Sequence, residues 1–329
     1  MRLSLMTAAA LALAGPAITE HACARKSAAA EPAEIAVPNS RRIAFKSAIN
    51  GRDYLVSVAI PQTPPPKGGY PVFYLLDSYW MFGSAVDNAR LNQPDVMIVG
   101  IGYPLDDPAF VVRATSAIDE RHATLLSDAP ARLKAIYALR THDLSLAISP
   151  DVWRIGGAPE MAESSAQLSG GLDKFLDVIE REVKPRVAKI VPVDTDKEAL
   201  FGHSLGGLAV LHALFTHPER YDSFIAASPS IWAAPVLWDE QQAFGRRVEQ
   251  GLTPPHILLT MGEKEQDGPA APAKMVDNMR EMARRLRTIR SLGKPLPVQD
   301  VVFTDEDHGS VQQPSVSRAI AFAFGKAEQ

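Results

Sequence analysis

The sequence predicts an α/β fold with a mostly parallel central sheet, and three observations support that prediction. Short apolar runs typical of buried strands alternate with segments of helical periodicity. The chain has 329 residues, 46% of them hydrophobic and 22% charged, which is enough for one large domain with a sizeable core. Finally, Gly202-His-Ser-Leu-Gly206 lies between an apolar run and a strong helix former, so it predicts a sharp turn from strand to helix.

The N-terminus is typical of an export signal. Arg2 precedes the apolar stretch Leu3–Ile18, and Ala22-Cys-Ala24 matches an A-x-A cleavage site. We therefore expect a signal peptide over residues 1–24 and a periplasmic or secreted protein. Lipidation of Cys23 is the less favoured alternative, because Glu20 stands where a lipobox has an aliphatic residue.

The remaining chain divides into a tether and a folded domain. Residues 25–40 are rich in Ala, Glu and Pro and predict a flexible tether, followed by a catalytic domain over 41–329. No later apolar segment approaches the roughly 18 uninterrupted residues of a membrane span. Cleavage after Ala24 would leave no cysteine, and therefore no disulfide.

The first strands of the domain follow from two patterns. Arg41–Lys46 and Tyr54–Ile60 flank Asn50-Gly51, a hairpin signal, and predict two antiparallel strands. Tyr70–Leu76 and Val96–Ile101 are continuous apolar runs, as expected of parallel strands buried on both faces.

The second half alternates more regularly. An amphipathic helix over Leu172–Val187 precedes the short strand Glu198–Phe201, and Leu208–Thr216 has the period of a buried helix. Further strands are predicted at His256–Met261 and Pro297–Phe303, before a last helix at Ser315–Phe324. The stripe Met275, Met279, Met282, Leu286 and Ile289 is a core face, not a cofactor site.

Residues 104–170 are turn-rich, with one clear helix at Arg132–Leu139. In a compact α/β domain, such a length indicates an insertion over the carboxyl ends of the strands, where ligands bind. We expect the insertion to shape the substrate pocket. Whether it also acts as a lid is not predicted.

The strand–turn–helix context makes Ser204 a candidate nucleophile, although a structural serine in a glycine-rich turn is an alternative reading of the motif. A serine hydroxyl needs a neutral imidazole to accept its proton, and the imidazole needs a carboxylate that fixes its tautomer. His308 follows the last predicted strand, and the loop after His256–Met261 holds three carboxylates. We favour Glu265, then Glu263, then Asp267, a choice that spacing alone does not settle.

An oxyanion that forms on the substrate carbonyl needs backbone N–H donors. One is expected from Leu205, directly after the nucleophile, and the second from the loop Leu76–Tyr79, at Ser78.

The chain resembles the esterase D and enterochelin-esterase branch of the α/β-hydrolases, a group that also includes feruloyl esterases, S-formylglutathione hydrolases and mycolyltransferases. The matching stretches are Tyr74–Asp77, Arg140–Ser145, Gly170–Phe175, Phe201–Gly207, Ala226–Trp232 and Asp307–Ser310. The resemblance implies an α/β-hydrolase fold, with helices on both faces of the sheet and an insertion over the active site.

For the site, the resemblance implies Ser204 as nucleophile, His308 as base and Glu265 as acid, although some members resemble a Ser–His dyad. It implies an esterase that forms an acyl-enzyme, acting on siderophore-type or small acyl or aryl esters. S-formylglutathione hydrolases usually have a cysteine near the site. Because the only cysteine of this chain is Cys23, the sequence does not favour that activity. The alternatives are an acyltransferase and a catalytically silent binding protein on the same scaffold.

Three further residues are candidates for substrate binding. Arg140 could hold an anionic group by bidentate hydrogen bonds, or it could pair with Asp143 or another neighbour and fix a loop. Trp232 and Trp80 could line the pocket or pack in the core. His203 is expected to pack locally.

No cofactor or metal is expected, because the sequence lacks H-E-x-x-H, a P-loop and a complete dinucleotide fingerprint. The net charge of -4 argues against a nucleic-acid partner. The oligomeric state is not predicted.

Overall fold

The computed structural model describes residues 36–116, 130–156 and 162–325. The predicted signal peptide, Cys23 and nearly all of the predicted tether lie outside the described residues. Ser40, predicted as the end of the tether, already belongs to the first strand. Within the described part, no helix is both long and apolar enough to cross a membrane.

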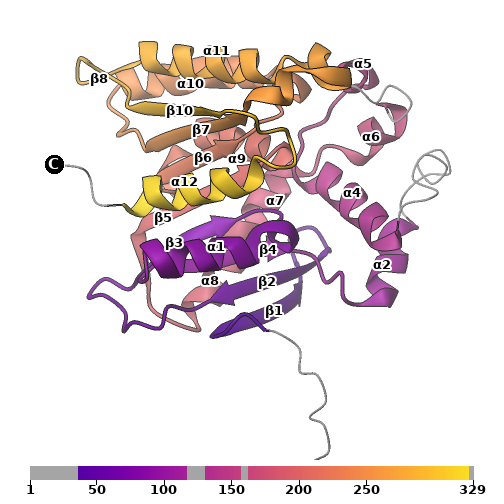
Figure 1. Ribbon diagram of the computed structural model, residues 1–329, viewed down its shortest axis with the longest axis vertical. Helices are drawn as coiled ribbons and strands as arrows, with labels where there is room; N and C mark the ends of the chain where they lie inside the picture. The colour runs from indigo at the N-terminus through magenta and orange to yellow at the C-terminus, as the bar shows by residue number, and fades with distance from the viewer. Residues whose placement is uncertain (1–35, 117–129, 157–161, 326–329) are drawn as a thin grey trace, which may run out of the picture. The chain divides into compact units, whose positions relative to one another are not determined.

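The described residues form an eight-stranded sheet with the order β1-β2-β4-β3-β5-β6-β7-β10 (Figure 1). β2 is antiparallel to both of its neighbours, and the other pairs are parallel. Gly51 turns the β1–β2 hairpin with a φ of 72°, so the predicted hairpin is confirmed. The strands are β1 Ser40–Lys46, β2 Asp53–Ala59, β3 Tyr70–Leu75, β4 Met97–Gly102, β5 Val193–His203, β6 Ser223–Ala227, β7 His256–Gly262 and β10 Val298–Phe303.

Helices cover both faces of the sheet, as predicted. On one face α1 (Ser78–Asn92) packs beside α12 (Gln312–Phe324), and their apolar residues share a core with β3, β5 and β6 (Figure 1). A larger core on the other face includes residues of α7 (Leu172–Val178), α9 (Leu205–Thr216), α10 (Leu237–Glu249) and α11 (Met275–Thr288). The methionines of α11 are buried there, which confirms the predicted core stripe.

Two helical segments differ from the prediction. The helix expected over Leu172–Val187 consists of α7, a π-helical turn at Ile179–Val183 and α8 (Lys184–Ala188). α1 begins at Ser78, within the stretch Leu76–Tyr79 that is predicted as a loop. Its weakly amphipathic sequence, Ser78–Asn92, gives little periodicity from which to predict it.

The insertion contains more helix than predicted. The helix expected at Arg132–Leu139 is α4, Ala131–Asp143, and α2 (Pro108–Thr115), α5 (Pro150–Ile155) and α6 (Ala162–Leu168) accompany it. These three helices have at most eight residues, too few to show a clear helical period. α5 contacts the short turn Ile231–Ala233, which follows the carboxyl end of β6. The insertion therefore reaches the edge of the sheet at which the candidate site lies.

Candidate active site

Ser204 occupies the sharp turn between β5 and α9. Its φ of 62° lies in a region that non-glycine residues rarely adopt. A Cβ on Gly202 would lie 2.3 Å from the carbonyl oxygen of Gly206, and one on Gly207 would lie 2.6 Å from that of Ala227. The glycines are thus required by close backbone approach, and the turn presents the serine at the N-terminus of α9.

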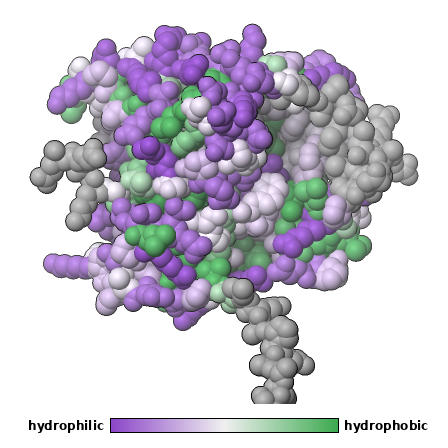
Figure 2. Space-filling view, in the orientation of Figure 1, coloured by the Kyte–Doolittle hydropathy of each residue, from purple (hydrophilic) through white to green (hydrophobic). Residues whose placement is uncertain are grey.

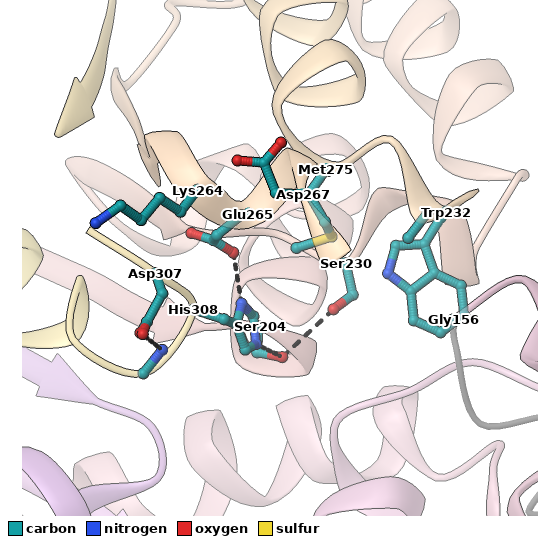
Figure 3. Close-up of a pocket in the computed structure, with 12 residues that line it drawn as sticks. Gly156, Ser204, Ser230, Trp232, Lys264, Glu265, Asp267, Met275, Asp307 and His308 are labelled. Carbon is teal, nitrogen blue, oxygen red and sulfur yellow. Dashed lines mark hydrogen bonds and ion pairs between the residues drawn. The ribbon is translucent and has the colours of Figure 1, made fainter. Parts of the chain in front are cut away.

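Ser204, His308 and Glu265 form one hydrogen-bonded chain (Figure 3). His308 Nε2 lies 3.0 Å from Ser204 Oγ, and its Nδ1 lies 2.5 Å from Glu265 Oε2. With Nδ1–H donating to the carboxylate, Nε2 is left as the acceptor for the serine proton. Glu263 instead accepts from the backbone N–H of Asp305. Of the acids considered, the structure thus brings Glu265 to the imidazole.

Glu265 is buried, and two hydrogen bonds hold the carboxylate oxygen that does not face His308. Its Oε1 accepts from the hydroxyl of Ser228 at 2.5 Å and from the N–H of Gly262 at 2.7 Å. Its other oxygen is thereby directed to His308. Ser228, at a φ of 42°, was not assigned a role from the sequence, because its function follows from the turn that it makes after β6. In the sequence, Ser228 stands out only as part of the family-like stretch Ala226–Trp232.

The loop that carries His308 is fixed on two sides. Asp307 accepts from the N–H groups of Ser310 and Gly309, and these bonds lower the pKa of its carboxyl. The ring of His203 packs against that of His308, with centroids 4.6 Å apart. Burial, followed by the nearby His308 and Arg140, holds the pKa of His203 well below its usual value. A neutral imidazole therefore supports the candidate base.

A cavity of about 400 Å³ opens over Ser204. Trp232 lies on its wall, as one reading of the sequence expected, and Ser230 Oγ lies 3.4 Å from Ser204 Oγ (Figure 3). The lining residues are Gly156, Ser204, Ser230, Trp232, Lys264, Glu265, Asp267, Ala273, Met275, Asp307, His308 and Gly309.

Arg140 does not line this cavity. Its Nε donates to Asp77 Oδ2 at 2.9 Å, and its Nη2 reaches the carbonyl oxygen of His203 at 3.4 Å. Burial tends to lower the pKa of the guanidinium, but the charge and hydrogen bond of Asp77, together with the nearby Tyr79 and Tyr103, outweigh burial and raise it. Arg140 thus clamps the β3–α1 turn to the end of β5, which agrees with the structural alternative for this residue.

The pairing of Arg140 with Asp143 is wrong. Asp143 is fully buried and accepts from the hydroxyls of Tyr54 and Tyr103. Its carboxylate faces the β1–β2 hairpin, so the three-residue spacing on α4 did not bring the two side chains together.

Trp80 also lies off the cavity wall. It is 44% exposed and packs edge-on against Tyr79, beneath the guanidinium of Arg140. Its predicted contact with substrate therefore finds no support in this cavity.

The two predicted oxyanion donors lie at helix starts. Leu205 is the first residue of α9, where backbone N–H groups have no intrahelical acceptor. Ser78 is the first residue of α1, and its side chain packs against Gly100 and Gly102 of β4. Any contribution of Ser78 to an oxyanion therefore comes from its N–H, and this role stays a prediction for both residues.

The described residues hold no cluster of three or more His, Cys, Asp or Glu side chains arranged to bind a metal ion.

Comparison with known proteins adds independent evidence. The Esterase family model matches residues 144–294. The chain is 32% identical to the ferri-bacillibactin esterase BesA of Bacillus subtilis, over 88% of this chain and 90% of that protein. It is 28% identical to the siderophore triacetylfusarinine C esterase of Aspergillus fumigatus, over 89% and 96%. Among solved structures, the BES protein from Bacillus cereus is similar with a TM-score of 0.69 at 25% identity, covering 89% of this chain and 99% of that one.

The fold, the strand–turn–helix that carries Ser204 and these relatives all indicate the same family. The chain belongs to the esterase family of α/β-hydrolases that includes the siderophore esterases, and it is a serine hydrolase of carboxylic esters.

Proposed function

We propose that this esterase cleaves an ester bond of a siderophore with Ser204 as nucleophile, His308 as general base and Glu265 as the acid. The observation that supports it most is the continuous chain from Glu265 through His308 to Ser204 at the floor of a cavity. The siderophore substrate is suggested by the two relatives, which are named for such esters.

In the first half of the reaction, Ser204 Oγ attacks the ester carbonyl while His308 Nε2 takes the hydroxyl proton. Glu265 stabilises the imidazolium that forms. The N–H of Leu205, with that of Ser78, would stabilise the oxyanion. Collapse of the tetrahedral intermediate breaks the carbon–oxygen bond of the ester, and His308 returns the proton to the departing alcohol. Ser204 is then acylated.

In the second half, water gives a proton to His308 Nε2 and attacks the acyl carbonyl. Breakdown restores the Ser204 hydroxyl with that proton and releases the carboxylic acid. Transfer of the acyl group to an alcohol uses the same residues, so the acceptor distinguishes hydrolysis from transfer. A silent binding protein would not require this aligned chain of side chains.

A fluorophosphonate probe tests the nucleophile. The full-length chain should be labelled and should turn over p-nitrophenyl esters, and Ser204→Ala should abolish both. His308→Ala should reduce both by about 10³-fold or more. Release of free acid from a siderophore ester by the wild type, with no acylated alcohol, identifies hydrolysis. A folded wild type that neither labels nor turns over any ester would contradict the proposal.

We also propose that the protein is exported through residues 1–24, from the basic, apolar and small-residue pattern of that segment. Fusion of this segment to a reporter that is active only outside the cytoplasm should give activity. Cys23→Ser should leave export intact if the protein is not lipidated, whereas loss of a membrane-bound form would support lipidation.

A further inference from the structure

The two loops that supply the acid and the base of the site are strongly acidic. The first follows β7 and the second follows β10, and these strands are neighbours in the sheet. Their carboxylates are Glu263, Glu265, Asp267, Asp305, Glu306 and Asp307, against the single lysine Lys264. Glu265, Asp267 and Asp307 line the cavity together with Lys264, so this side of the cavity carries an excess of negative charge.

The ion pairs do not remove this excess. Among the described residues that line the cavity, Lys264 is the one lysine or arginine, and Asp305 lies 3.3 Å from its ammonium. Asp307 accepts hydrogen bonds from two backbone N–H groups, which lower the pKa of its carboxyl and favour its ionised form. Asp267 lines the cavity, and no cation of the described chain forms an ion pair with it. Arg140, which lies off the cavity wall, is paired with Asp77.

The cavity also has apolar lining. Trp232, Met275 and Ala273 contribute it, and Figure 3 shows Trp232 across the site from Lys264 and Asp307. A ligand group can gain contact area there without charge. Toward the acidic loops, by contrast, an anionic group would lose hydration and meet carboxylates of the same sign.

We propose that this cavity selects neutral or cationic esters over anionic ones. The inference rests on the proposed ester hydrolysis and goes beyond it by naming the substrate class. For a siderophore, an iron chelate with a net negative charge is then a poor substrate. The iron-free form, or a chelate without net charge, is the better one.

Matched synthetic esters test the selectivity without any siderophore. Three p-nitrophenyl esters share one acyl chain and end in a tert-butyl, a trimethylammonium or a sulfonate group. We expect kcat/KM, corrected for alkaline hydrolysis, to be about tenfold lower for the sulfonate than for the tert-butyl ester at low salt. The difference should shrink in about 1 M salt, where the screening length is only about 3 Å.

Charge variants assign the effect to the loop. Asp267→Asn should raise the ratio of the sulfonate to the tert-butyl rate several-fold, and Asp267→Lys should raise it further. Asp239→Asn removes an exposed carboxylate on α10, outside the cavity lining, and should leave that ratio unchanged. A siderophore that forms an anionic iron complex should be cleaved faster without iron.

The outcomes separate this inference from the proposed function. Equal turnover of the three esters, or faster turnover of the sulfonate ester, overturns the charge selectivity while ester hydrolysis stands. Loss of turnover for all three esters contradicts the proposed function itself. A sulfonate penalty that is equally present in Asp267→Lys and at high salt also overturns the inference, because it points to steric exclusion.

Discussion

Two buried carboxylates flank the nucleophile, and each holds a basic side chain in a different way. Glu265 is bound to His308, which is 48% exposed and faces Ser204. Asp77 is bound to Arg140, which is 14% exposed and faces a backbone carbonyl. The first pair presents a titratable base to the reacting atom, whereas the second fixes the backbone beneath it. Similar ion pairs therefore serve catalysis or structure according to what the base contacts.

Among changes to the two ion pairs, the largest effect on activity is expected for Glu265→Gln. The amide cannot stabilise an imidazolium, and it can hold His308 in the wrong tautomer. We expect kcat to fall about 10³–10⁴-fold with little change in KM. Measurement of p-nitrophenyl ester hydrolysis, alongside thermal unfolding, checks this. A loss below tenfold would show that Ser204 and His308 suffice as a dyad.

Ser228→Ala is a milder change that affects the same carboxylate. It removes one of the two bonds to Glu265 Oε1 but leaves the carboxylate in place. We expect kcat to fall about tenfold, in line with the roughly 1–3 kcal/mol cost of an unsatisfied buried group. Full activity in this variant would mean that the Gly262 N–H alone orients the acid.

For the second pair, the expected effect is on stability. Among the side chains that the structure describes, Arg140→Met leaves the Tyr79 hydroxyl as the one hydrogen-bond donor to the buried Asp77. We expect the free energy of unfolding to fall by about 3 kcal/mol. KM should change equally for anionic and neutral esters. A rise in KM confined to anionic esters, with unchanged stability, would restore Arg140 as a substrate clamp.

The comparison of the two pairs also explains what the sequence could predict. Ser204, His308 and Glu265 follow the ends of β5, β10 and β7, and parallel sheet topology brings such strand ends to one edge. Their order and loop positions were therefore informative. Arg140, Trp80 and Ser228 take their contacts from the packing of α4, α1 and a turn, which no local periodicity encodes. The same holds for the short helices of the insertion.

Gly156→Ala tests how the insertion shapes the cavity. An added Cβ would lie 2.2 Å from the indole ring of Trp232, so the ring or α5 must move. We expect KM to rise about tenfold, consistent with overpacking costs of about 1–3 kcal/mol. Tryptophan fluorescence should shift in parallel.

Gly83→Ala is the matched control for that substitution. Nothing lies within 4 Å of its added Cβ, and Gly83 belongs to α1, outside the insertion. This variant should keep the KM and the fluorescence of the wild type. If Gly156→Ala behaves in the same way, the insertion does not set the position of Trp232.

The smallest effect concerns a third buried base, on the helix that begins directly after Ser204. His212 of α9 is bound by Glu240 of α10 and Asp173 of α7, and it faces no substrate. Burial lowers the pKa of His212, but the bonds and charges of the two carboxylates outweigh burial and raise it. The stabilisation is therefore complete below pH about 6.5, the unfolded value, and is lost as pH rises through the raised folded pKa.

Denaturant unfolding of the wild type and His212→Gln across this pH range measures what His212 contributes to the free energy of unfolding. As pH rises through this range, the wild type should lose more of its free energy of unfolding than the variant does. His217→Gln, at a 43% exposed histidine, should retain the wild-type pH dependence. If His212→Gln also retains it, the imidazole is neutral in the folded protein. A neutral imidazole has one N–H, so it would then donate to only one of the carboxylates of Glu240 and Asp173.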